Sequence, residues 1–191
     1  MSSTSVAKIT GLSLIAISLT LFTLIYFPVA KEEIRYRTFT APKQIVPVDT
    51  NFGIVIPKIG ANAKVIANVD WKNQGVYTEA LSRGVAHAKG SALPGKVGNV
   101  FIFAHSAGNF YEANRYNAIF YLLDKLVKGD EIDIYYNGGK FTYFVTNKAT
   151  VDGSQVQYLS GNDQTQTLTL MTCWPPGTTF KRLIIQAKPS L

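Results

Sequence analysis

The sequence is poor in the residues that build disulfide scaffolds and metal sites. Its 191 residues include one cysteine, Cys173, and two histidines, His87 and His105. A single cysteine excludes an internal disulfide framework and a cysteine-built zinc site, and two histidines argue against a multi-histidine centre. We therefore expect no metal and no cofactor.

Basic clusters are also missing. The net charge is +7, but the Lys and Arg residues are dispersed, and no nucleic-acid-binding motif, internal repeat or low-complexity tract is present. We expect no nucleic-acid partner. The positive charge suits anionic surroundings such as phospholipid headgroups or wall polymers, or it only keeps the protein soluble. The hydrophobic content of 47% excludes a disordered chain and allows one folded domain with an appendage.

The longest uncharged segment lies near the N-terminus. Residues 9–30 carry no charge and are bounded by Lys8 and Lys31. A helix of that length reaches about 33 Å, enough for a hydrocarbon core of about 30 Å. A cleaved secretory signal is the alternative, but Pro28 stands where a small residue is needed for cleavage. We predict a short cytoplasmic tail at 1–8 and a transmembrane anchor at 9–30; the flanking charges do not fix its orientation.

Beyond this segment the chain is predicted to be mainly β. Residues 31–52 contain two prolines and little periodicity, which indicates a stalk, so the folded domain is assigned to 53–191. The expected strands are short, one of them containing Pro57 as an edge or bulge, and a hairpin turns at 137–139. The expected strands span residues 53–60, 99–104, 131–136, 140–145, 167–172 and 182–187.

Two brief helices are also expected. One spans 73–83 and is closed by Gly84, and the other spans 117–127 and is stopped by Gly129. Many short strands with one or two short helices favour a closed or nearly closed β-barrel.

The lone Cys173 is the strongest candidate for chemistry. A buried structural thiol is the alternative interpretation, but Cys173 ends an alternating strand and precedes a Trp-Pro-Pro-Gly loop. Strand ends that lead into loops are where rigid scaffolds present reactive side chains. A cysteine nucleophile needs a nearby base or cation and a donor for the developing oxyanion.

Two further residues can meet those needs. His105 also ends an apolar strand, and Arg182 opens the last strand, nine residues after Cys173. Two adjacent antiparallel strands would return Arg182 to the side of Cys173, where its guanidinium can donate to an oxyanion. Taken singly, a structural histidine and a surface arginine are the simpler interpretations.

Several separated motifs resemble the sortases, membrane-anchored cysteine transpeptidases of bacterial surfaces. Residues 169–173 (TLMTC) resemble the TLxTC signature of that family, and 98–105 (GNVFIFAH) resembles the stretch that ends in its catalytic histidine. The other matching stretches, in the family's order, are 54–60, 84–87, 93–95, 129–132 and 182–185.

The resemblance implies an eight-stranded sortase-type barrel outside the cell, on a single membrane span. It also implies Cys173 as nucleophile, His105 as general acid and base, and Arg182 as the oxyanion and positioning residue. We further predict that their neighbours Thr172, Trp174 and Ala104 contact the substrate, and we treat His87 as structural. Residues 31–52 lack the Asp-Pro-aromatic lid of class C enzymes, and no carboxylate cluster suggests a class A calcium site, so class D or E is nearest.

By this resemblance the substrates are proteins with a C-terminal LPXTG-like signal, cleaved between Thr and Gly. The acceptor is an amine of a peptidoglycan precursor or a protein lysine, and 152–166 is expected to form a mobile, water-excluding loop. Two alternatives stay open. One is a cysteine hydrolase using the same three residues, and the other is a tethered basic barrel that binds anionic wall polymer.

Overall fold

The structure, a computed structural model, divides into two units, Met1–Thr40 and Ala41–Leu191. It describes residues 10–23, 27, 34, 45–106, 119–153 and 164–190. Residues 10–23 are helical, and the hydroxyls of Thr20 and Thr23 donate to carbonyls four residues earlier at 2.8 Å. Among the described residues, none of the helices has the length and hydropathy needed to cross a membrane. The predicted tail 1–8 and part of the predicted anchor 9–30 lie outside the described residues, so the anchor stays a prediction.

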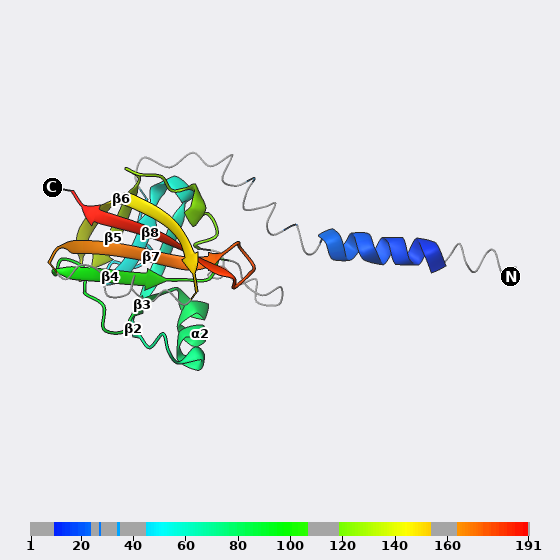
Figure 1. The fold of residues 1–191 in the computed structure, drawn as a ribbon, viewed down its shortest axis with the longest axis horizontal. Helices are drawn as coiled ribbons and strands as arrows, with labels where there is room; N and C mark the ends of the chain where they lie inside the picture. Colours follow the sequence, from blue (N-terminus) through cyan, green and yellow to red (C-terminus); the bar gives the residue numbers. More distant parts are fainter. Residues whose placement is uncertain are drawn as a thin grey trace, which may run out of the picture. The chain divides into compact units, whose positions relative to one another are not determined.

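The second unit is a closed eight-stranded barrel with the strand order β1-β2-β3-β4-β7-β8-β6-β5 (Figure 1). One α-helix, α2, packs beside β2 and β3, and two short 3-10 helices, η1 and η2, lie in the connections. The bounds are β1 Phe52–Ile56, η1 Pro57–Ile59, β2 Ala61–Val69, α2 Gln74–Arg83, β3 Val85–Ala88, β4 Gly98–Phe103, η2 Leu123–Lys125, β5 Glu131–Tyr136, β6 Gly139–Asp152, β7 Gln166–Trp174 and β8 Lys181–Pro189. The predicted barrel is confirmed.

The barrel closes because its strands carry large apolar side chains at alternate positions. On β7, Leu168 and Leu170 are fully buried, and they pair with Ala187 and Ile185 of β8, which are buried as well. Such alternation places one side of each strand in the core and leaves the other for the surface or a covering element. β4 is buried along its whole length, on both faces.

Strand direction brings three chain segments to one end of the barrel. β4 runs parallel to β7, and β7 runs antiparallel to β8. The last residues of β4, the last residues of β7 and the first residues of β8 therefore lie at the same end of the barrel, with β7 in the middle. We call this end of the barrel the β4–β7–β8 pole.

The predicted helix over 73–83 is confirmed, because α2 begins after Asn73, whose side chain accepts a hydrogen bond from the Val76 amide at 3.2 Å. The predicted helix over 117–127 is wrong where the structure describes it, from residue 119 onward. That part contains turns and only the three-residue η2. The carbonyls of Asp124 and Leu126 accept from Lys148 Nζ at 2.7 and 3.0 Å, a long-range partner that the local pattern did not reveal.

The predicted strand 53–60 is also shorter than expected. β1 ends at Ile56, and Pro57 opens η1 instead of acting as an edge or bulge within the strand. Proline has no amide hydrogen for the ladder and is well suited to a first helical position. Of the predicted loop 152–166, Asp152 ends β6 and Gln166 begins β7, and 154–163 lie outside the described residues.

The end of the predicted stalk is attached to the barrel. Asn62 of β2 accepts from the Val48 amide at 2.9 Å and donates to the Val46 carbonyl at 2.7 Å. Asp49 accepts from the Phe52 amide at 3.1 Å and pairs with Lys64 at 3.4 Å. Burial opposes ionisation of Asp49, but these amide and lysine interactions outweigh it, and its pKa is lowered. These contacts fix where the chain enters β1.

Candidate active site

Cys173 and Arg182 are direct partners in the β7–β8 ladder. Opposed residues of an antiparallel pair have Cα atoms about 4.5–5.5 Å apart and project from the same face. Both side chains are half-buried. The sequence predicted this return of Arg182 to the side of Cys173, and the register confirms it.

His105 lies at the same pole, two residues after β4. The β4–β7 register pairs Phe103 with Met171, and the Ala104 amide donates to the Met171 carbonyl at 3.1 Å. Extending that register by two residues sets His105 level with Cys173, one strand away. His105 is also half-buried. Cys173, Arg182 and His105 thus lie at the same pole of the barrel, and their joint role in catalysis stays a prediction.

A buried hydrogen bond joins the two strands just before these residues. Thr172, which is 2% exposed, donates from Oγ1 to the Ala104 carbonyl at 2.9 Å. Since Thr172 precedes Cys173 and Ala104 precedes His105, this bond ties the backbones that carry both groups. Both residues are buried, and their bond is placed to position Cys173 and His105. Their predicted contact with the substrate stays a prediction.

The guanidinium of Arg182 is held by its own loop. Its Nη1 donates to the carbonyls of Thr179 and Lys181, both at 3.1 Å, and Gly153 lies beside its Nη2. These contacts fix one nitrogen of a planar group that has five N–H donors. A guanidinium fixed in this way is suited to present its other donors to a developing negative charge.

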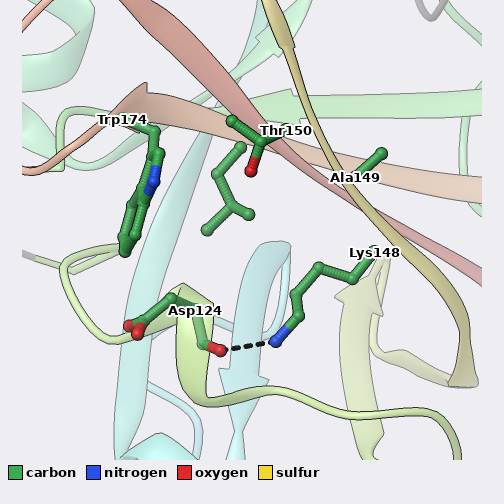
Figure 2. A pocket seen from close by; sticks show the side chains of 6 residues that line it. Asp124, Lys148, Ala149, Thr150 and Trp174 are labelled. Atoms are coloured by element: carbon green, nitrogen blue, oxygen red, sulfur yellow. Dashed lines mark hydrogen bonds between the residues drawn. The ribbon is translucent and has the colours of Figure 1, made fainter.

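Trp174, the third predicted contact residue, lines a pocket on the other side of β7. Successive side chains of a strand point to opposite faces, so Trp174 projects away from the Cys173 face. The pocket has a volume of about 300 Å³ and its walls come from β6, β7, β8 and η2 (Figure 2). The lining residues are Asp124, Lys148, Ala149, Thr150, Trp174 and Leu183.

His87 lies within the barrel wall on β3 and is 2% exposed. Its Nδ1 accepts from the Asn68 amide at 3.3 Å, and its Nε2 donates to the Ala92 carbonyl at 2.9 Å. This bonding defines a neutral ring with its proton on Nε2. Burial lowers the pKa of His87, and the bond to Ala92 opposes that effect only in part. Its environment agrees with the structural role predicted from sequence.

Within the part of the chain that the structure describes, no group of three or more His, Cys, Asp or Glu residues could hold a metal ion. The functional groups at this pole are the thiol of Cys173, the imidazole of His105 and the guanidinium of Arg182. This combination suits nucleophilic attack, proton transfer and oxyanion stabilisation at a carbonyl.

Residues 54–190 match the sequence model of the sortase-domain family. The chain belongs to the sortase family. It is 27% identical to Sortase D of Bacillus subtilis over 136 residues, which cover 70% of this chain and 60% of that protein. A lid mutant of Sortase A from Corynebacterium diphtheriae has a TM-score of 0.62 at 26% identity, covering 78% of this chain and 74% of that one. A Clostridium perfringens Sortase D5 transpeptidase shares the fold, with a TM-score of 0.60 at 24% identity, covering 85% and 95%.

The pocket residues were the part of this sortase that sequence reasoning missed. Asp124, Lys148, Thr150 and Leu183 come from three separate elements. Leu183 belongs to the matching stretch 182–185, but no motif or periodic pattern in the sequence indicated that these four residues share a site. Of the pocket residues, only Trp174 was singled out from the sequence, because it follows Cys173. Its position in the sequence did not specify on which face of β7 its side chain lies.

Proposed function

We propose that this sortase is a membrane-anchored cysteine transpeptidase that joins surface proteins to an amine acceptor. The observation that carries the proposal is the placement of Cys173 opposite Arg182, with His105 two residues beyond the end of β4, the strand that pairs with β7. The membership of residues 54–190 in the sortase family supports it. We assign the anchor to residues 9–30, with the barrel outside the cell, and we infer class D or E from the motifs and from the Sortase D relative.

The first half-reaction cleaves a C-terminal LPXTG-like signal between Thr and Gly. The thiolate of Cys173 attacks the Thr carbonyl carbon, and a C–S bond forms while the carbonyl oxygen gains the negative charge. Arg182 donates to that oxygen. The C–N bond then breaks, His105 gives its proton to the departing glycine amine, and a thioester on Cys173 remains.

The second half-reaction transfers the acyl group. The amine of a peptidoglycan precursor or a protein lysine attacks the thioester carbonyl, and His105 removes its proton. The C–S bond breaks, Cys173 leaves as the thiolate, and an amide bond replaces the thioester. A membrane tether supports this sequence, because it concentrates the enzyme where translocated substrates and lipid-linked precursors are found.

Product analysis tests the proposal. The full-length chain is incubated with LPXTG-type peptides, with and without an added amine, and the products are identified by mass spectrometry. We expect amine-capped peptide from the wild type and none from Cys173→Ala. Cleaved peptide that stays uncapped at every amine concentration would support the hydrolase instead. No cleavage, with salt-sensitive binding of anionic wall polymer that survives Cys173→Ala, would support the polymer-binding barrel.

A further inference from the structure

The pocket beside Trp174 has no part in the chemistry proposed above, yet it adjoins both Cys173 and Arg182 along the chain. Its lining residue Trp174 follows Cys173, and its lining residue Leu183 follows Arg182. β7 ends at Trp174 and β8 begins at Lys181. The pocket and the Cys173 thiol therefore lie on opposite faces of the sheet, where β7 ends and β8 begins.

One side of this pocket is suited to a cation. Figure 2 shows the carboxylate of Asp124 on the same side of the pocket as the indole of Trp174. A carboxylate together with an indole face attracts an ammonium group by charge and by the ring quadrupole. Asp124 Oδ2 is 3.8 Å from Lys125 Nζ, a separation too long for a hydrogen bond, so this ion pair leaves acceptor capacity on the carboxylate.

Another part of the pocket wall is suited to an anion. The ammonium of Lys148 lies there, held by the carbonyls of Asp124 and Leu126 at 2.7 and 3.0 Å. An ammonium has three N–H donors, so these two bonds leave one. The hydroxyl of Thr150, on the same strand, supplies a further donor to the pocket. The fixed positive charge of Lys148 would disfavour a ligand that carries only a cation.

We propose that this pocket binds an amino-acid unit of the acceptor, with its ammonium at Asp124 and Trp174 and its carboxylate at Lys148 and Thr150. The inference deepens the proposed function and rests on it. The docked unit belongs to an acceptor whose attacking amine reaches the Cys173 thioester over the end of β7. The acceptor substrate is accordingly a zwitterionic amino-acid unit that carries an additional amine for the attack on the thioester. A simple alkylamine is expected to be a poorer acceptor substrate.

Direct binding tests this pocket without any turnover. The full-length Cys173→Ala chain is titrated with L-lysine while the indole N–H signals of both tryptophans are followed by NMR. Trp71, the second tryptophan, is the internal control, because it lies outside the pocket and has Lys72 over its ring at 5.3 Å. We expect a saturable shift at Trp174, none at Trp71, and weaker binding of cadaverine, which lacks the carboxylate, and of hexanoate, which lacks the ammonium.

The charge-removing variant Asp124→Asn sharpens the test. It keeps the side-chain shape and the main-chain bond to Lys148, and it should weaken L-lysine binding about fivefold, the scale of one partly exposed ion pair. The matched control is Asp70→Asn, which removes a half-buried carboxylate outside the pocket and should leave binding unchanged. The proposal is overturned if the two tryptophans shift alike, if Trp174 does not shift, or if Asp124→Asn binds L-lysine as tightly as the parent.

Turnover separates this inference from the function on which it rests. Wild-type protein is assayed in parallel for capping of an LPXTG-type peptide. Capping without lysine binding at Trp174 would overturn the pocket proposal and leave the transpeptidase standing. Binding at Trp174 without cleavage of any peptide would overturn the transpeptidase and remove the acceptor role from the pocket.

Discussion

The hydrogen bond between Thr172 and Ala104 gives the sharpest prediction about how the fold positions its chemistry. Thr172→Val removes the hydroxyl that donates to the Ala104 carbonyl at 2.9 Å and keeps the shape of the side chain. One neutral hydrogen bond contributes about 1 kcal/mol net. For a domain of this size that lowers the melting temperature by about 2–4 °C.

The effect on activity should exceed the effect on stability. The bond ties the residue before Cys173 to the residue before His105, and small misplacements of catalytic groups cost up to about 100-fold in rate. We expect kcat/KM for LPXTG-type peptide cleavage to fall at least about tenfold in Thr172→Val. Thermal unfolding and peptide cleavage by the full-length variant measure the two effects.

Thr169→Val is the matched control. Thr169 lies on the same strand, is also 2% exposed, and donates to Asn99 of β4 at 2.9 Å, but it is four residues from Cys173. We expect a similar loss of stability and less than about a twofold change in kcat/KM, since a structural bond away from reacting groups affects the folded state alone. Equal losses of activity in the two variants, or full activity in Thr172→Val, would refute the reasoning.

Three further predictions concern other parts of the barrel. Burial lowers the pKa of His87 below its unfolded value of about 6.5, so the unfolded chain binds more protons as the pH falls. The free energy of unfolding should be level above pH about 6.5 and decline below it, and urea titrations of His87→Gln should show a smaller decline. Gly53→Ala would drive its Cβ into the Asp49 carbonyl and should cost about 1–3 kcal/mol by thermal unfolding, whereas Gly75→Ala, whose Cβ meets nothing closer than 3.5 Å, should not destabilise; equal losses would contradict this. Arg182→Lys keeps the charge but loses the planar donors, and should reduce kcat about 100-fold in the peptide assay with little change in stability; wild-type kcat would remove Arg182 from oxyanion stabilisation.

Local patterns predicted much of the fold. The alternation in β5 and at the start of β6, with Asn137 at their turn, identified a hairpin without any tertiary information. The loop between Cys173 and Arg182 is short, so antiparallel pairing alone sufficed to oppose them. The capping residue Asn73 marked the start of α2.

Long-range partners account for what local patterns missed. The parallel pairing of β4 with β7 brings the segment that leads to His105 to the same pole as Cys173, but it joins residues 68 positions apart. The sequence marked His105 as a candidate by its position at a strand end and did not specify this pairing. Lys148 bonds the carbonyls around η2, where the local pattern predicted a helix. The pocket combines residues of β6, β7, β8 and η2 in the same way, so neither its residues nor its two opposite charges could be predicted from their spacing in the sequence.

Acylation of Cys173 by a sorting signal would appear directly as a change in the intact mass of the enzyme. The full-length chain is mixed with an LPXTG-type peptide without added amine and analysed by mass spectrometry. We expect a mass increase that equals the peptide portion ending in Thr, located on Cys173, absent from Cys173→Ala and discharged when an amine is added. A chain that cleaves the peptide without carrying this adduct, or an equal adduct on Cys173→Ala, would contradict the account.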